Sequence, residues 1–173
     1  MATGQPVVGI VMGSDSDWKI VKSASDTLKD FGVAHEVRVI SAHRTPHRAA
    51  EYASSAADRG LKIIIAAAGG AAHLGGVLAA HTTLPVIGIP VKGGALNGID
   101  ALLATLQMPS GIPVATVTVG SAGPVNAAVL TAQILALSDG ELAGRMAEYK
   151  QGLQAKVDKG DAAVQDDLGQ TGA

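Results

Sequence analysis

The sequence contains no cysteine and few aromatic or charged residues, and each shortage excludes a class of protein. Without cysteine there is no disulfide scaffold, no thiol nucleophile and no cysteine-based zinc or iron–sulfur site. Aromatic residues make up 2% of the 173 residues, and charged residues make up 16%, against roughly 25% in an ordinary globular protein. Thirteen Lys and Arg against fifteen Asp and Glu give a net charge of −2, so the basic excess that attracts nucleic acid or anionic lipid is missing.

Long apolar runs are missing as well. Gly, Pro or His interrupts every apolar stretch before it reaches the ~20 residues of a membrane-spanning helix. Residues 1–6 lack the basic segment and apolar run of a secretion signal, so we expect a cytoplasmic protein with no membrane partner. Disorder is not expected either, because 47% of the residues are hydrophobic and the net charge is low. The composition is typical of one soluble globular domain.

The charge that is present is unevenly distributed. From Gly60 to Gly140 the only charged residues are Lys62, Lys92, Asp100 and Asp139. A soluble monomer has to cover its surface with polar groups, so a stretch with so little charge should be largely hidden. It either forms the centre of the fold or is covered by other copies of the chain. Burial at the centre of the fold and assembly into a homo-oligomer are therefore the two explanations that the sequence offers.

Short β-branched runs alternate with segments of helical periodicity along the chain. The expected strands are Val7–Met12, Val33–Ile40, Leu61–Ala67, Pro85–Ile89 and Ile112–Val119. The expected helices are Asp15–Phe31, Thr45–Arg59, Ala72–His81, Gly98–Gln107, Pro124–Leu137 and, as an extra C-terminal helix, Gly140–Lys156. This alternation predicts an α/β fold with a five-stranded parallel sheet and helices on both faces. We expect one catalytic domain over residues 1–158 and a polar, flexible tail over 159–173.

Ligands of an open parallel sheet bind outside the carboxyl ends of its strands. This rule selects the segments 13–18, 41–47, 68–74, 90–98 and 120–126 before any motif is considered. Polar residues of the apolar middle of the chain gather in the same segments. The topology and the composition thus indicate the same edge of the sheet.

The first of these segments joins a strand to a helix and contains Ser14, Asp15 and Asp17. Hydroxyls and backbone N–H groups at a helix N-terminus form an anion site. The alternative interpretation is that Ser14 or Asp15 serves only as a helix cap. Asp17 can accept hydrogen bonds from ribose hydroxyls or simply compensate the helix dipole. The segment is neither a P-loop nor a GxGxxG fingerprint, so no motif supports ATP or NAD.

The second segment, SAHRTP, packs Ser41, His43 and Arg44 into four residues before a helix whose expected cap is Thr45. Arginine binds phosphate in a bidentate manner, and imidazole both gives and takes protons near neutral pH. We therefore interpret His43 and Arg44 as functional. His47, one turn into the helix, is expected at the surface.

The third segment, AGGAAHLGG, has small residues that let backbone N–H groups approach a ligand closely. His73 either lines the same cleft or serves as a capping or packed histidine. No metal is expected, because the histidines lack ligand spacing and no acidic cluster completes a set. A Ser–His–Asp hydrolase built on Ser14 or Ser41 lacks the G-x-S-x-G elbow that would position its nucleophile.

Seven motifs taken together resemble one known family. They are GSDSDW, SAHRTP, AGGAAHL, LPVIGIPV, LNGIDALLATLQMP, GIPVATV and NAAVLTAQIL, in this order from about Val7 to Leu137. The set resembles the class I, bacterial-type N5-carboxyaminoimidazole ribonucleotide mutases, the catalytic-subunit family of phosphoribosylaminoimidazole carboxylase.

This resemblance implies a three-layer flavodoxin-like (Rossmann-like) sandwich and a homo-octamer with sites near subunit junctions. It implies an isomerase of purine (IMP) biosynthesis that converts N5-carboxyaminoimidazole ribonucleotide to 4-carboxy-5-aminoimidazole ribonucleotide without metal or organic cofactor. Three alternatives stay open: a carboxylase that uses CO2 directly, a non-catalytic nucleotide-binding or assembly module, and a carboxylase-like domain acting on another cyclic amine or pyridine nucleotide. The AAHL sequence favours the mutase over the CO2-using class.

The resemblance also assigns roles by position. His43 matches the catalytic acid/base, and Asp17 would hold the ribose hydroxyls while Ser14 and Arg44 fix the phosphate. The residues that fall where the cleft surrounds the base and carboxylate are Ser41, Gly69, Gly70, His73 and Leu74. The sequence departs from the family pattern at Ala67, at Gly75 and at 93–95, which leaves the fine shape of the cleft open.

Overall fold

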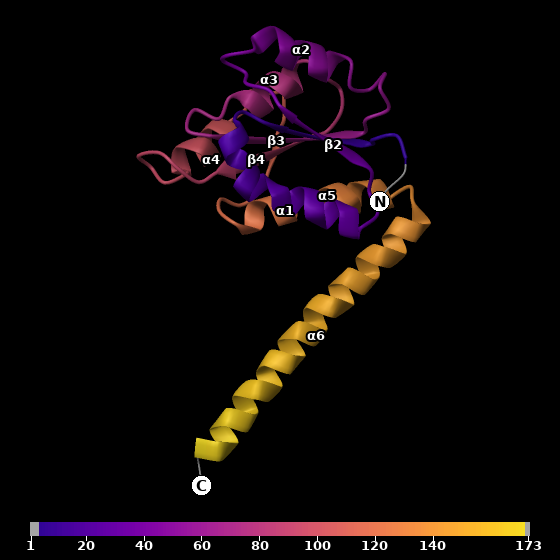
Figure 1. The fold of residues 1–173 in the computed structure, drawn as a ribbon, viewed down its shortest axis with the longest axis vertical. Helices are drawn as coiled ribbons and strands as arrows, with labels where there is room; N and C mark the ends of the chain where they lie inside the picture. Colours follow the sequence, from indigo (N-terminus) through magenta and orange to yellow (C-terminus); the bar gives the residue numbers. More distant parts are fainter. Residues whose placement is uncertain (1–3, 172–173) are drawn as a thin grey trace. The chain divides into compact units, whose positions relative to one another are not determined.

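The fold is built on one parallel sheet, seen in a computed structural model that describes residues 4–171 (Figure 1). Its strands are β1 (Val8–Met12), β2 (His35–Val39), β3 (Ile63–Gly69), β4 (Val86–Val91) and β5 (Ala115–Thr116). They are all parallel and lie in the order β2-β1-β3-β4-β5. The expected five-stranded parallel sheet of an α/β fold is confirmed.

The central strands are buried on both faces because helices cover both. Every residue of β1 and β4 is buried, and Ile10 pairs with Ile65 at the centre of the sheet. Strands covered on both sides consist of continuous apolar residues rather than an alternation, as in VGIVM and VIGIPV. The edge strand β2 (HEVRV) is only partly covered, and it carries charged residues.

The helices alternate with the strands along the chain. They are α1 (Trp18–Asp30), preceded by the short 3-10 helix η1 (Asp15–Asp17), α2 (Pro46–Ser54), α3 (Leu74–Ala80), α4 (Ile99–Leu106), α5 (Ala122–Ala136) and α6 (Gly140–Thr171). Figure 1 shows α2 and α3 on one face of the sheet and α1 with the first part of α5 on the other. These three layers confirm the expected sandwich, and the extra C-terminal helix is present.

Two glycines let helices pack closely on the sheet. A Cβ atom at Gly9 in β1 would collide with the hydroxyl of Tyr52 on α2. A Cβ at Gly88 in β4 would collide with the methyl group of Thr105 on α4. Both glycines are buried within strands, where a side chain would normally add packing. Close approach of the layers therefore explains part of the high glycine content.

The last strand is much shorter than predicted. Only Ala115 and Thr116 form the ladder with β4, although the sequence indicated a strand over 112–119. Pro113 has no N–H to donate, and the left-handed turn at Gly111 (φ 90) immediately precedes this stretch. The N–H of Val117 still donates to the carbonyl of Gly88 at 3.1 Å, so the segment follows β4 without regular pairing.

The last helix is longer than predicted. α6 runs from Gly140 to Thr171, whereas the sequence indicated a helical end at Lys156. The segment beyond Lys156 contains no proline, and its alanines, leucine and glutamines favour helix enough to continue past Gly160.

The chain divides into two compact units, up to Ala132 and from Gln133. The domain limits at 158 and the flexibility of residues 159–173 stay predictions. No helix within residues 4–171 is long and apolar enough to span a membrane.

Candidate active site

The loops after β1, β2 and β3 enclose a cavity of about 420 Å³ at the carboxyl edge of the sheet. These loops are neighbours because β1 pairs with both β2 and β3. The cavity is lined by Gly13, Ser14, Asp17, Ser41, Ala42, His43, Arg44, Ala68, Gly69, Ala72, His73 and Leu74. All the residues predicted for the site belong to this lining except Gly70. Three loops far apart in the sequence thus converge where the topology predicts.

Two histidines from different loops are in direct contact in this cavity. Nε2 of His43 and Nδ1 of His73 are 2.8 Å apart, and the rings meet edge to face with centroids 4.9 Å apart. Only one of two imidazole nitrogens at this distance can carry the hydrogen between them. The pair can therefore hold one extra proton and keep this hydrogen bond, but not two. It is a proton donor and acceptor in a single unit.

Arg44 is fixed against the cavity by the loops around it. One NH2 group donates to the carbonyl of Gly13 at 2.9 Å, and Nε donates to the hydroxyl of Ser41 at 3.4 Å. The backbone N–H of Arg44 also donates to this hydroxyl, at 3.1 Å. Guanidinium has five N–H donors, so these contacts orient the plane and leave donors for an anion.

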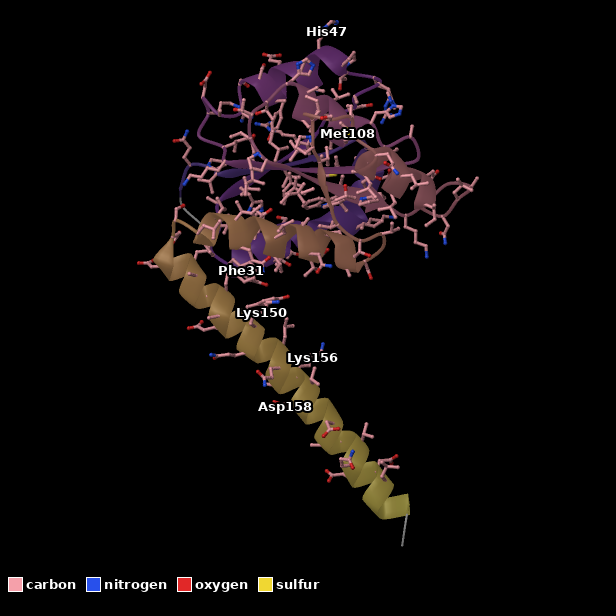
Figure 2. The ribbon with its side chains drawn as sticks, turned by 180° about the vertical axis from the view of Figure 1, so that it is seen from behind. Phe31, His47, Met108, Lys150, Lys156 and Asp158 are labelled. Atoms are coloured by element: carbon pink, nitrogen blue, oxygen red, sulfur yellow. The ribbon has the colours of Figure 1, made fainter. Side chains whose placement is uncertain are left out.

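Thr45 does not cap the following helix as the sequence indicated. Its hydroxyl donates to the carbonyl of Ser41 at 2.9 Å and accepts from the N–H of Ser41 at 3.0 Å. The hydroxyl therefore closes the turn 41–45 and makes no capping bond to α2. This turn holds His43 and Arg44 in place, so Thr45 has a supporting role that sequence reasoning missed. His47 is exposed on α2, as predicted (Figure 2).

The first loop positions Ser14 and Asp17. The hydroxyl of Ser14 accepts from the N–H of Ser16 at 3.3 Å, which is the capping role left open by the sequence. Burial raises the pKa of the Asp17 carboxyl above its ordinary value, although hydrogen bonds to Ser14 and Ser16 favour the charged form. A half-buried carboxyl that faces a cavity can accept hydrogen bonds from hydroxyl groups of a ligand.

Neither serine is prepared for nucleophilic attack. The Ser41 hydroxyl is engaged by Arg44, and the Ser14 hydroxyl donates to Asp15 at 3.3 Å. A serine nucleophile needs a histidine base within hydrogen-bond reach, and the bond of His43 is to His73. The arrangement suits proton transfer better than a covalent serine mechanism. Within residues 4–171 there is also no group of three His, Cys, Asp or Glu residues that could hold a metal.

The third loop brings the backbone close to the cavity. Gly70 has φ 60 and Ala72 has φ 44, so the chain turns twice through the left-handed region that favours glycine. Ala72 is nevertheless buried and lines the cavity. The selected segments contain Gly13, Ala42, Ala68 and Ala72, but the sequence singled out none of these four as a site residue. The unusual positions Ala67 and Gly75 are buried outside the lining.

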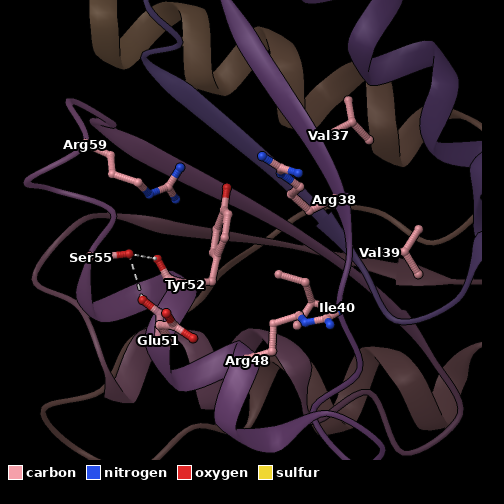
Figure 3. A pocket seen from close by; sticks show the side chains of 9 residues that line it. All are labelled: Val37, Arg38, Val39, Ile40, Arg48, Glu51, Tyr52, Ser55 and Arg59. Atoms are coloured by element: carbon pink, nitrogen blue, oxygen red, sulfur yellow. Dashed lines mark hydrogen bonds between the residues drawn. The ribbon is translucent and has the colours of Figure 1, made fainter.

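A larger cavity of about 590 Å³ lies beside the edge strand β2 (Figure 3). Its polar groups are largely engaged with one another. Arg59 pairs with Glu36 at 2.6 Å, and the hydroxyl of Tyr52 donates to the same carboxylate at 2.8 Å. Burial of Tyr52, followed by its bond to Glu36, raises the pKa of the phenol. This cavity contains no histidine, so the proton-transfer groups belong to the cavity at the carboxyl edge.

Comparison with known proteins identifies the family of the chain. The family described as AIR carboxylase matches residues 7–156. The chain is 55% identical over 153 residues to the N5-carboxyaminoimidazole ribonucleotide mutase of Bacillus subtilis. The aligned residues cover 88% of this chain and 94% of that protein. It is 52% identical over 159 residues to the protein of the same name from Pyrococcus horikoshii, covering 92% and 89%. The crystal structure of Treponema denticola PurE has a TM-score of 0.82 at 33% identity, covering 91% of this chain and 97% of that chain. The chain belongs to the AIR carboxylase family.

Proposed function

We propose that the chain is an enzyme that converts N5-carboxyaminoimidazole ribonucleotide to 4-carboxy-5-aminoimidazole ribonucleotide, an isomerase step of purine biosynthesis. The observation that carries the proposal is the His43–His73 pair in a cavity that also presents Asp17 and Arg44. The identity of more than half the residues to mutases along nearly the whole chain gives independent support.

The reaction moves a carboxyl group from an exocyclic nitrogen to a ring carbon. His43 in its protonated form gives its proton to the nitrogen while the N–C bond of the carbamate breaks and CO2 leaves. The ring carbon C4 then attacks CO2, and neutral His43 removes the proton from C4. One proton is given and one is taken back, so the imidazole ends as it began and no redox step is needed. General acid–base catalysis of this kind contributes typically ~10²–10⁴-fold.

His73 acts as a positioning residue for His43. Its hydrogen bond engages Nε2 of His43, so Nδ1 is the nitrogen left to exchange a proton with the substrate. His43 can donate its Nε2 hydrogen to Nδ1 of His73 whether its own Nδ1 is protonated or not. The bond therefore persists when Nδ1 gains or loses a proton. The walls formed by Ala42, Ala68 and Ala72 are small and apolar, which keeps CO2 near C4 and reduces its loss to water.

The remaining residues bind the ribonucleotide. Arg44 and Ser14 hold the phosphate, and Asp17 accepts hydrogen bonds from the ribose hydroxyls. The groups that surround the base and its carboxylate are Ser41, Gly69, Gly70, His73 and Leu74. In this arrangement the acid–base pair lies next to the reacting atoms. The charged groups bind the ends of the substrate.

An absorbance assay for 4-carboxy-5-aminoimidazole ribonucleotide tests the function. With the carbamate substrate, we expect turnover that does not depend on added bicarbonate. With the decarboxylated amine, we expect product only at high bicarbonate. Product formed efficiently from the amine and CO2, and not from the carbamate, would assign the chain to direct carboxylation. Absence of product from both substrates would leave only a binding role.

The active form is proposed to be a cytoplasmic homo-octamer. The outer face of α4 supports assembly, since Ile99, Leu103 and Leu106 are each about half exposed at helical spacing. We expect light scattering to give a mass eight times that of the 17.2 kDa chain. The substitution Leu103→Asp should lower that mass, whereas Leu103→Met, which keeps the side chain apolar, should not. A monomeric mass for the unsubstituted chain would contradict the assembly.

A further inference from the structure

α6 carries an apolar stripe whose C-terminal part is exposed. The stripe repeats every 11 residues, first as Leu142 and Met146, then as Leu153 and Val157, and last as Val164 and Leu168. An 11-residue period corresponds to 3.67 residues per turn, so all six side chains lie along one face of the helix. Residues 151–169 are exposed throughout, and α6 is one continuous helix there (Figure 1).

The stripe changes from buried to exposed along the helix. Leu142 and Met146 are buried, whereas Leu153, Val157, Val164 and Leu168 are 43%, 69%, 57% and 59% exposed. Helices in proteins are stabilised mainly by packing of an apolar face, so this exposed face favours a partner along the helix. The match to the family ends at residue 156, so most of this exposed stripe lies beyond the shared fold.

The spacing of the stripe is symmetric about its own midpoint. Leu153 and Leu168 are equally far from the midpoint between Gly160 and Asp161, and so are Val157 and Val164. Two copies that run in opposite directions around this midpoint would bring Leu153 against Leu168 and Val157 against Val164. Such self-complementarity is the property of a two-fold interface. Gly160, at the centre of the stripe, allows the two helices to approach closely.

The two halves of this segment carry opposite net charge. Residues 150–160 contain three lysines and one aspartate, and residues 161–171 contain three aspartates and no basic residue. Figure 2 shows Lys150 and Lys156 extending from the basic half. Antiparallel pairing sets the basic half of one helix against the acidic half of the other. Parallel pairing would set like charges side by side.

We propose that the segment 150–171 of α6 pairs antiparallel with the same segment of a second copy of this chain, with the two-fold axis at Gly160–Asp161. This surface is distinct from the apolar face of α4. It extends the assembly of the chain beyond the part that the family shares.

The absence of cysteine allows a direct test on the full-length protein. Single-cysteine variants are oxidised under mild conditions and the covalent dimer is measured. Gly160→Cys lies near the axis, where helices packed ~8–10 Å apart bring the two Cα atoms within reach of a disulfide. We expect it to cross-link at least tenfold faster than Ala162→Cys, which lies close in sequence on the opposite face of the helix.

Two further variants determine the direction of pairing. Leu153→Cys alone should not cross-link, because in an antiparallel pair its two copies are ~22 Å apart along the helix. Leu168→Cys alone should not either, but chains carrying the two substitutions should cross-link when they are co-expressed. Self-cross-linking of Leu153→Cys would overturn the antiparallel arrangement. Equal rates for Gly160→Cys and Ala162→Cys would show random collision and would overturn the pairing itself. Circular dichroism of each variant checks that α6 remains helical.

Discussion

The substitution His43→Asn lowers kcat for the carbamate substrate by about 10²–10⁴-fold, the usual contribution of a general acid–base group. Asparagine keeps a polar side chain of similar reach, but it neither gives nor takes a proton at neutral pH. Because the same imidazole acts first as acid and then as base, both halves of the reaction lose their catalyst. Steady-state absorbance kinetics at saturating substrate measure the loss, and KM should change much less than kcat.

The matched control is His47→Asn. His47 is exposed on α2, four residues along the chain, and it is not part of the cavity lining. This variant should retain its activity. The partner of His43 gives a second comparison: His73→Asn should lower kcat less than His43→Asn and should alter the pH dependence of kcat, since one member of the proton-sharing pair is lost. If His43→Asn turned over the substrate at an unchanged rate, the assignment of the acid–base group would be wrong.

The fold could be predicted from the sequence because its signals are local. Continuous β-branched runs identify the buried strands, and Gly32, with φ 71, follows the end of α1. The helix predicted over Thr45–Arg59 ends at Ser54, and turns lead from there to Gly60, with φ 88. β5 was overestimated because an apolar stretch containing Pro113 resembles a strand without being able to pair as one. α6 was underestimated because its polar, exposed part beyond Lys156 resembles a tail.

The candidate site could be predicted in position but not in its contacts. The rule for parallel sheets selects the three loops, and residue chemistry selects His43 and Arg44 within them. Which side chains touch is decided by tertiary packing, so the bond between His43 and His73, 30 residues apart, has no local signal. The same limit explains Thr45. Its hydroxyl could either cap the following helix, as predicted, or bond to the backbone of Ser41, and in the structure it does the second.

The substitution Arg44→Ala raises KM for the ribonucleotide by about 10–150-fold, because a hydrogen bond to a charged group contributes roughly 1.5–3 kcal/mol. The effect on kcat should be smaller, since a phosphate held equally in the ground state and the transition state supplies uniform binding. Arg44→Lys should recover only part of the loss, because an ammonium keeps the charge and lacks the planar fork that Gly13 and Ser41 orient.

The phosphate contact is isolated by repeating the measurement with the nucleoside form of the substrate, which lacks the phosphate. Unsubstituted enzyme and Arg44→Ala should then have similar values of kcat/KM, so the difference between the two substrates gives the energy of the contact alone. An equal loss with both substrates would contradict phosphate binding. It would indicate instead that Arg44 acts by joining the Gly13 loop to the Ser41 turn, so that its removal displaces the neighbouring His43 from the reacting atoms.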